Sequence, residues 1–256
     1  ARLLPALGLL LLALPAAADV LHVKRDSDVY REPDRNSDVV FAVRVQDREG
    51  PYTIPLLESA RVNGFYKVRV PGRPRLGWIY KTAVRRYAAN HPAFRAYDRK
   101  LYRHWIDADS DCQKARDEVL IRDSRGPVQF EGTQQCKVAA GLWLDPYTGE
   151  SFRDPGDIQI DHVVALKNAH DSGAWAWTAA RRREYANYLE YDQHLLAVKG
   201  VENNRKSDKG PDQYLPPLES YRCQYVRLWV QIKEDWVLNM SDAEAAAVQK
   251  VLASCP

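Results

Sequence analysis

The sequence predicts an α+β protein in which a small all-β barrel precedes a larger domain of mixed helices and strands. Short alternating runs separated by turn residues fill residues 19–88, a pattern typical of a barrel of short strands. Near residue 90 the pattern becomes helix-like, and two strand-like runs follow within residues 91–256. A chain of 256 residues is long enough for two hydrophobic cores, so we expect two domains with these boundaries.

A Leu-rich run occupies residues 1–18, behind Arg2 and ending in three small residues, Ala16, Ala17 and Ala18. This pattern predicts a secretory signal peptide, and therefore an exported protein in a periplasmic or extracellular space. A membrane anchor is the alternative, but the apolar run is too short to span a bilayer comfortably. No later stretch of sequence is apolar enough to cross a membrane, so we expect no transmembrane segment in the mature chain.

Four cysteines form an even set in a chain predicted to reach an oxidising compartment. Such a set favours two disulfide bonds. Four cysteines allow three pairings, and we favour the pairing of nearest neighbours, Cys112 with Cys136 and Cys223 with Cys255. A zinc site is the competing explanation, but no C-x-x-C spacing supports it.

The first domain carries two turn signals. Asn63-Gly64 lies between alternating runs and predicts a hairpin, and Pro71-Gly72 marks another turn. The run Asn63–Val70 and the following Gly77–Ile79 resemble the ending of bacterial SH3-like domains, and the resemblance covers most of residues 20–87. Barrels of that family bind cell-wall peptides or act as spacers, so the resemblance implies a cell-wall ligand as one expected partner.

The second domain contains the stretch DIQIDHVVAL, which alternates like a strand and places Asp161 beside His162. A second predicted strand covers residues 194–199, and a turn at Gly200 and a short polar helix with Asn203 follow it. Folding this hairpin and helix together brings the end of the first strand to the start of the helix. We therefore expect Asp161, His162 and Asn203 around one point.

Three helical stretches complete the second domain. Residues 178–191 and 225–238 have helix-like patterns. Residues 242–252 are rich in alanine, with Ser241 as a predicted N-cap and Glu244 three residues later, which predicts a capped terminal helix. The seven tryptophans are best explained as packing residues, because large aromatic side chains dominate core burial.

The residue types at the predicted meeting point suit the hydrolysis of a phosphodiester. A carboxylate and an amide oxygen are hard ligands that fit Mg²⁺, which takes waters and phosphate oxygens in its other positions. An adjacent imidazole can deprotonate a water molecule for in-line attack on phosphorus. For Asp161 and His162 taken alone, the alternative is a hydrogen-bonded pair that closes a strand end.

The same segments resemble the ββα-metal, or HNH, endonuclease motif. The resemblance rests on Asp161–Leu166, His194–Val198 and Asn203–Asp208. Stretches such as CQKARDEVLIRDS, CKVAAGLWLDPYTGE and YRCQYVRLWVQIK narrow it to secreted proteins related to the C-terminal nuclease domain of GmrSD-type restriction enzymes, over roughly residues 94–255. Three positions carry a residue other than the usual Thr, Pro or Gly of that pattern: Ala115, Ala165 and Ser207.

The resemblance implies a role for each matching residue. His162 is the general base that activates water, and Asp161 and Asn203 are ligands of a divalent metal, Mg²⁺ with Mn²⁺ as a substitute. His194 orients His162 or the loop by hydrogen bonding, and the alternative is a solvent-facing polar residue at a strand start. The spacing to the following residues selects Asn203 over Asn204, which is the alternative ligand and a candidate helix cap.

Three cationic residues are candidates for binding the scissile phosphate: Arg116, Lys137 and Lys206. Surface charge or an ion pair explains each of them equally well. The run Arg181–Arg183 can track a nucleic-acid backbone, although such runs are more often a solvated helix face. From residue 91 onward, 22 Lys and Arg face 25 Asp and Glu, so affinity for nucleic acid has to come from local clusters or a metal.

Acidic residues before Cys112 offer a second metal hypothesis. Asp107, Asp109, Asp111 and Glu118 have the spacing of ligands in a calcium loop of the EF-hand type. Such loops need glycine for a sharp turn at the position that Cys112 occupies here. The family resemblance already accounts for the acidic run, so we do not expect calcium to bind there.

The sequence therefore predicts an exported, metal-dependent HNH endonuclease that acts on DNA, with RNA as an alternative substrate. We expect little sequence preference, because nothing in the chain resembles a major-groove recognition module. The competing prediction is a non-catalytic envelope protein that binds through its first domain. A cell-wall hydrolase is a third class, but it needs a Cys–His pair or paired catalytic carboxylates, and no such arrangement stands out.

Overall fold

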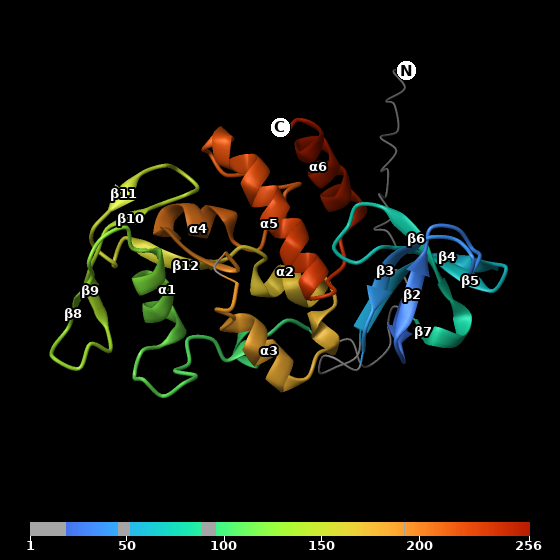
Figure 1. Cartoon of the computed structure of the whole chain (residues 1–256), viewed down its shortest axis with the longest axis horizontal. Coiled ribbons are helices and arrows are strands. Elements are labelled where there is room, and N and C mark those ends of the chain that lie inside the picture. Colours follow the sequence, from blue (N-terminus) through green and yellow to red (C-terminus); the bar gives the residue numbers. More distant parts are fainter. Residues whose placement is uncertain (1–18, 46–51, 89–95, 192) are drawn as a thin grey trace, which may run out of the picture.

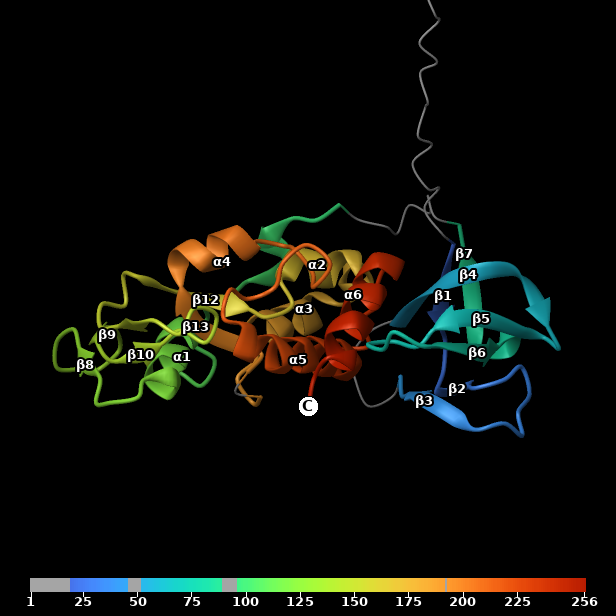
Figure 2. The same cartoon turned by 90° about the horizontal axis from the view of Figure 1, so that it is seen from above.

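The computed structural model describes the chain in four stretches: residues 19–45, 52–88, 96–191 and 193–256. It shows a mixed α+β protein with an antiparallel sheet at one end of the long axis, small hairpins at the other, and most helices between them (Figure 1 and Figure 2). The predicted signal peptide and the predicted domain boundary near residue 90 lie outside the described residues. None of the helices in these stretches is long and apolar enough to cross a membrane.

The described N-terminal part forms one seven-stranded sheet in which all neighbours are antiparallel. Its strands are β1 (Val20–Val23), β2 (Ser27–Tyr30), β3 (Val39–Val43), β4 (Tyr52–Val62), β5 (Phe65–Arg69), β6 (Leu76–Tyr80) and β7 (Val84–Tyr87). Their order is β3-β2-β6-β5-β4-β1-β7, and the 3-10 helix η1 (Lys81–Ala83) precedes β7. The expected run of short strands is confirmed, whereas the SH3-like barrel stays a prediction.

The hairpin between β4 and β5 turns at the Asn63-Gly64 pair that the sequence marks. Both turn residues have positive φ, 51° for Asn63 and 82° for Gly64, which is the type I′ conformation that suits the twist of paired strands. β4 pairs with β1 through its first residues and with β5 through its last, with a register shift midway. This shift bends the strand, so one sheet encloses a hydrophobic cluster that includes Leu21, Ile54 and Ile79.

The described C-terminal part consists of helices and three two-stranded antiparallel sheets. Its α-helices are α1 (Ala115–Asp123), α2 (Leu166–Asp171), α3 (Ala179–Ala186), α4 (Gly200–Lys206), α5 (Arg222–Asp235) and α6 (Asp242–Ala253). Its 3-10 helices are η2 (Arg99–Tyr102), η3 (Ala174–Ala176) and η4 (Glu219–Tyr221). Its paired strands are β8 (Gln129–Phe130) with β9 (Val138–Ala140), β10 (Trp143–Leu144) with β11 (Ser151–Phe152), and β12 (Ile158–His162) with β13 (Leu195–Lys199).

The helices confirm most of the sequence pattern. α5 covers most of its predicted range, and α6 begins with the expected capping box, in which Ser241 and Glu244 each bond the other's backbone N–H. α3 is shorter than its pattern indicates. It ends at Ala186, where the Asn187 side chain donates to the carbonyl of Arg103 in another segment. The same side chain also donates to the carbonyl of Arg183, so a local bond and a tertiary contact coincide at the end of this helix.

Both predicted disulfides are present, Cys112–Cys136 and Cys223–Cys255, so the nearest-neighbour pairing is confirmed and no cysteine is left for zinc. The first joins the acidic loop before α1 to the loop before β9. The second joins the start of α5 to the residues after α6. Each crosslink restricts the unfolded chain and so favours the folded state.

The N-terminal sheet contacts the helices through close backbone approaches. Asn239, between α5 and α6, donates its side-chain amide to the carbonyls of Thr53 in β4 and of Ser172, at 2.9 Å each. Gly72 has a φ of 69°, and a Cβ atom there would lie 2.4 Å from atoms of Glu234. Only glycine permits both this conformation and this approach.

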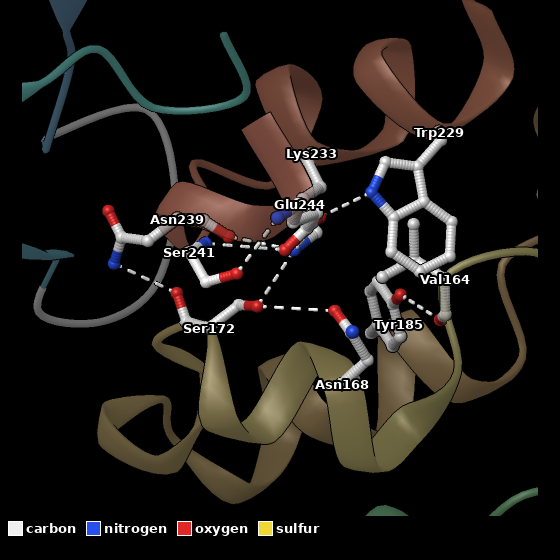
Figure 3. Close-up of polar contacts among 9 residues, drawn as sticks. All are labelled: Val164, Asn168, Ser172, Tyr185, Trp229, Lys233, Asn239, Ser241 and Glu244. Carbon is white, nitrogen blue, oxygen red and sulfur yellow. Dashed lines mark hydrogen bonds and ion pairs between the residues drawn. The ribbon is translucent and has the colours of Figure 1, made fainter. Parts of the chain in front are cut away.

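A buried polar cluster joins α2, α5 and α6 beside this junction (Figure 3). The ammonium group of Lys233 is fully buried and donates to Ser172 Oγ (2.9 Å), Asn239 O (2.7 Å) and Glu244 Oε1 (2.6 Å). The indole N–H of Trp229 donates to the same Glu244 oxygen. Burying these charges is acceptable because each has an ion-pair partner and hydrogen bonds.

The basic run Arg181–Arg183 at the start of α3 fits neither interpretation of its sequence, a track for a nucleic-acid backbone or a solvated helix face. Arg181 and Arg182 are buried, and only Arg183 is exposed. The Arg181 guanidinium lies over the rings of Tyr52 (5.0 Å) and Trp177 (4.9 Å), so it packs between the sheet and the helices. The first two arginines therefore belong to the interior: aromatic rings of both parts of the chain surround Arg181, and Arg182 donates to the carbonyl of Trp177.

Candidate active site

The hairpin and helix expected from the sequence form one unit. β12 and β13 pair antiparallel, with Asp161 opposite Leu196 and His162 opposite Leu195. α4 starts directly after β13, so Gly200 is its first residue and there is no separate turn. The N–H of Gly200 donates to the carbonyl of Asp157 at 2.9 Å, which keeps the helix start against the beginning of β12.

One face of β12 packs against one face of α4. Gln159 and Asp161 are two positions apart and so share a face of the strand, while Asn203 and Lys206 are three apart and share a face of the helix. Asn203 Nδ2 donates to Gln159 Oε1 at 2.9 Å. Lys206 Nζ donates to Asp161 Oδ1 at 2.8 Å and to the carbonyl of His162 at 3.0 Å. Two side-chain contacts therefore fix the position of α4 against β12.

Asp161 is a buried carboxylate with a partner on each oxygen. Lys206 bonds Oδ1, and the hydroxyl of Tyr147 donates to Oδ2 at 2.6 Å. Burial raises the pKa of Asp161, and the charge and hydrogen bond of Lys206 and the bond from Tyr147 act in the opposite direction. Sequence reasoning missed Tyr147, whose only signal was its place in the family-like stretch CKVAAGLWLDPYTGE.

His162 is buried on the opposite side of the strand end. Its Nε2 lies 3.0 Å from the carbonyl oxygen of Ala186, the last residue of α3. A carbonyl can only accept, so Nε2 carries the hydrogen and neutral imidazole keeps a lone pair on Nδ1. Within the described chain no hydrogen bond reaches Nδ1. Burial and then the neighbouring His194 lower the pKa of His162 well below its usual range, so the ring is neutral at neutral pH.

His194 is held by the same helix end. Its Nε2 donates to the carbonyl of Tyr185 at 2.8 Å, one residue before the carbonyl that holds His162. Helix C-termini leave their last carbonyls without intrahelical partners, and here two imidazoles supply donors to consecutive carbonyls. The rings of His162 and His194 lie 6.3 Å apart edge to face, with no hydrogen bond between them. His194 is therefore bonded to the end of α3 and not directly to His162.

Asp161, His162 and Asn203 line one cavity of about 500 Å³ at the end of β12. The strand stops at His162, so neighbouring side chains that leave the strand on opposite faces still border the same space. Asn204 and Asp208 also line it. The predicted convergence of these three residues therefore agrees with the structure, although their roles remain predictions.

None of the three residues expected to bind a phosphate lines the cavity. Lys206 is fully buried, and its ammonium bonds Asp161 because both residues occupy the packed faces of strand and helix. Arg116, on α1, donates to the carbonyls of Pro155 and Ile158. Lys137 pairs with Glu131 in the β8–β9 hairpin. Neither Arg116 nor Lys137 lines the cavity.

The oxygen atoms at the cavity fit a hard divalent cation. Each oxygen of Asp161 has one hydrogen-bond partner and retains acceptor capacity, because an ionised carboxylate offers about four lone-pair sites. The amide nitrogen of Asn203 donates to Gln159, so the amide oxygen of Asn203 is the atom left to bind a metal. Carboxylate and amide oxygens with waters match the preference of Mg²⁺.

The acidic stretch before α1 is a separate feature. Asp107, Asp109 and Asp111 are exposed, with ligand atoms within 4.8 Å of one another, and none of them lines the cavity. Both oxygens of Asp107 accept backbone N–H groups, from Ser110 at 2.8 Å and from Cys112 at 3.1 Å. The arrangement is a loop closed by its own hydrogen bonds.

Residues 114–251 match the family described as GmrSD restriction endonucleases, C-terminal domain. The chain belongs to this family. The match includes β12, β13 and α4, and hence Asp161, His162 and Asn203. The family relationship connects the cavity to nucleases.

A second comparison matches a longer part of the chain than the family does. The chain is 40% identical over 159 residues to a protein of Arthroderma benhamiae described as an uncharacterized secreted protein, covering 62% of this chain and 76% of that one. No solved structure matches the chain. The GmrSD family match begins at residue 114, so cavity residues before that position lie outside it.

Proposed function

We propose that the protein is an exported, metal-dependent endonuclease of the HNH type that hydrolyses phosphodiester bonds of nucleic acids. The observation that carries the proposal is the arrangement of His162, which lines the cavity with Asp161 and Asn203, has its Nε2–H fixed by the Ala186 carbonyl, and has no hydrogen bond to Nδ1 within the described residues. Membership of a nuclease family supports the same reaction class.

In the proposed reaction His162 acts as the general base. Its Nδ1 accepts a proton from a water molecule while the water oxygen forms a bond to phosphorus, and the bond from phosphorus to the leaving sugar oxygen breaks. The leaving oxygen then takes a proton from solvent. The Ala186 carbonyl stabilises the imidazolium that forms, because it accepts the Nε2–H in both protonation states.

The metal ligands in this proposal are Asp161 and Asn203. A divalent cation bound there, Mg²⁺ or Mn²⁺, supplies positive charge for the phosphate and for the leaving oxygen. Lys206 and Tyr147 hold the Asp161 carboxylate in place from the interior. Their role is that of supporting groups, which orient a ligand and set its charge.

The substrate is proposed to be DNA, with RNA as the alternative, and sequence preference is proposed to be weak. Two observations support export: the two disulfides, which persist in oxidising compartments, and the relative described as secreted. Residues 19–88 are proposed to be a separate SH3-like domain with a cell-wall ligand, and residues 91–256 the nuclease domain.

The test is cleavage of supercoiled plasmid by the oxidised chain of residues 19–256, with Mg²⁺, with EDTA and as His162→Ala. We expect cleavage that EDTA abolishes and that His162→Ala slows by about 10²–10⁴-fold, the usual contribution of a general base. A matched control is His104→Ala, because His104 does not line the cavity. Thermal melting of each variant verifies that it is folded.

Two results would contradict the proposal. Folded wild-type protein that cleaves neither DNA nor RNA with Mg²⁺ or Mn²⁺ is not a nuclease of this kind. Equal activity of His162→Ala and His104→Ala would remove His162 from the reaction and leave the metal ligands to explain any cleavage.

A further inference from the structure

One wall of the cavity comes from a segment that sequence reasoning did not connect with the site. Residues 96–106 precede the region that matches the nuclease family, and Tyr97 and Arg99 within them line the cavity with Asp161 and His162. The segment includes the 3-10 helix η2. The site is therefore completed by chain from outside the family match.

Hydrogen bonds fasten this segment to the helices. Tyr102 of η2 is fully buried, with its hydroxyl 3.2 Å from Nδ1 of His170 in α2. The Asn187 side chain donates to the carbonyl of Arg103 at 3.0 Å and accepts from the N–H of Ile106 at 3.1 Å. The backbone that directly follows Arg99 is therefore fixed to α2 and to the end of α3.

The same fastening connects the segment to the proposed base. Asn187 directly follows Ala186, whose carbonyl bonds His162. The ring of Trp105 lies 5.6 Å from the ring of His162. A single end of α3 therefore positions both the imidazole and the segment that carries Arg99.

Arg99 is an exposed cation whose charge has no carboxylate partner in the described chain. Lys167 is the other cationic side chain in the cavity wall, and it pairs with Asp171 (2.6 Å) and Asp208 (3.7 Å). Arg99 lines the same cavity as His162, the proposed base. Its guanidinium is thus near the base and available to an anion.

Tyr97 supports Arg99 and is not itself free to stack on a base. Its ring packs edge to face on His170 at 5.6 Å and lies 6.0 Å from the ring of Tyr102. Burial raises the pKa of Tyr97, and the charge of Arg99 and a hydrogen bond from it act in the opposite direction. The guanidinium therefore lies beside the phenol oxygen at the cavity wall.

We propose that Arg99 binds the phosphate that is cleaved and stabilises the negative charge that grows on it during the reaction, in place of the three cations predicted from the sequence. This inference rests on the proposed nuclease function. Guanidinium suits the task because its planar fork donates two parallel hydrogen bonds to phosphate oxygens and stays charged at all relevant pH values. The substrate class is a phosphodiester anion, which the backbone of any nucleic acid supplies.

The first experiment compares steady-state cleavage by wild type, Arg99→Ala, Arg99→Lys and Lys100→Ala. Lys100 is the matched control, because it is the next residue of η2, is exposed and does not line the cavity. We expect Arg99→Ala to lower kcat/KM by about 10²–10³-fold, chiefly through kcat, as loss of one donor to a growing oxyanion does. Arg99→Lys restores part of the loss, and Lys100→Ala stays within about 3-fold of wild type.

A second experiment measures the contact between Arg99 and phosphate under conditions in which no cleavage occurs. In EDTA, fluorescence anisotropy measures binding of a labelled phosphodiester oligonucleotide and of its uncharged methylphosphonate analogue. We expect wild type and Lys100→Ala to prefer the charged oligonucleotide, and Arg99→Ala to lose about 10-fold of that preference. A merely structural role for Arg99 would weaken binding of both oligonucleotides alike.

The outcomes separate this inference from the nuclease proposal. Inactive wild type together with an Arg99-dependent preference for charged phosphate would end the nuclease proposal and keep the phosphate site. Active wild type with equal losses for Arg99→Ala and Lys100→Ala would overturn the role of Arg99 and keep the nuclease. An unchanged preference in Arg99→Ala overturns it as well.

Discussion

Among the described residues, two buried lysine–carboxylate pairs lie in the C-terminal part of the molecule, and only one of them stands beside a base. Lys206 bonds Asp161 at 2.8 Å, and Lys233 bonds Glu244 at 2.6 Å. All four side chains are almost completely buried. By burial and distance alone the two pairs are the same.

The neighbours of each pair distinguish them. Lys233 also bonds Ser172, a serine beside a lysine that resembles a nucleophile and its base, but the ammonium of this lysine is paired with Glu244. Ser172 instead donates to Asn168 (Figure 3). Beside Asp161, by contrast, His162 keeps an available ring nitrogen. A buried ion pair is therefore poor evidence for a reaction site, and an oriented base next to it is better evidence.

The largest predicted effect comes from removing the lysine of each pair. Lys206→Met and Lys233→Met each leave a carboxylate buried without its cation, so we expect each to lower the free energy of unfolding by about 3–5 kcal/mol. Denaturant unfolding measures both values. Plasmid cleavage at a temperature where both variants are folded should fall more than about 10-fold only for Lys206→Met.

This pair of variants tests the comparison directly, because each is the control for the other. Equal cleavage by the two folded variants would mean that Lys206 has no bearing on the site. A loss of cleavage in Lys233→Met would mean that the Ser172 cluster participates in activity.

The next effect concerns the histidines that distinguish the two pairs. Burial lowers the pKa of His194 to about 4, against 6.5 for an unperturbed imidazole. Between these values the unfolded chain binds a proton that the folded chain does not, so the free energy of unfolding decreases as the pH falls from 6.5 to about 4. The difference of pKa corresponds to roughly 3 kcal/mol for this residue.

Urea unfolding of wild type and His194→Asn at pH 7 and pH 4 measures this contribution. Asparagine can still donate to the Tyr185 carbonyl and has no proton to gain, so we expect the variant to lose roughly 3 kcal/mol less than wild type over that range. An equal acid loss in both proteins would show that His194 titrates normally.

The smallest effect concerns the ends of the helices that carry the pairs. Ser207, directly after Lys206 at the end of α4, has a φ of 52°, a conformation that glycine adopts without strain. We expect Ser207→Gly to raise the free energy of unfolding by about 1 kcal/mol. Ser254, at the end of α6, has a φ of −96°, so Ser254→Gly should give no gain in the same thermal and denaturant measurements. Equal shifts in both variants would contradict the argument from φ.

Much of the site could be predicted because it is local in sequence. Alternation marked the strand of Asp161 and His162, a second strand followed later in the chain with a polar helix directly after it, and these three elements pack on one another. The Asn63-Gly64 hairpin was predictable for the same reason. The usual glycine of the family pattern at Ser207 also has a local explanation, its positive φ.

The remainder depends on which face of an element meets which neighbour. Lys206 was predicted to face phosphate, but helix spacing also places it one turn from Asn203 on the face that packs against Asp161. Nothing in the sequence says which of its neighbours an ammonium group will meet. Tyr147 bonds Asp161 from the interior and Arg99 lines the cavity, and both come from segments distant in sequence, so only the tertiary fold brings them to the site.

The C-terminal end of α3 has a consequence for redesign of this chain. The consecutive carbonyls of Tyr185 and Ala186 accept hydrogen bonds from His194 and His162. The side chain of the next residue, Asn187, bonds the segment that contains Arg99. Adding or deleting one residue in the last turn of α3 would rotate these two carbonyls by about 100° about the helix axis and so misplace both imidazole rings. Changes of length for a tag, a permutation or a domain insertion therefore have to avoid this turn, even though it contains no residue that would take part in the reaction through its own side chain.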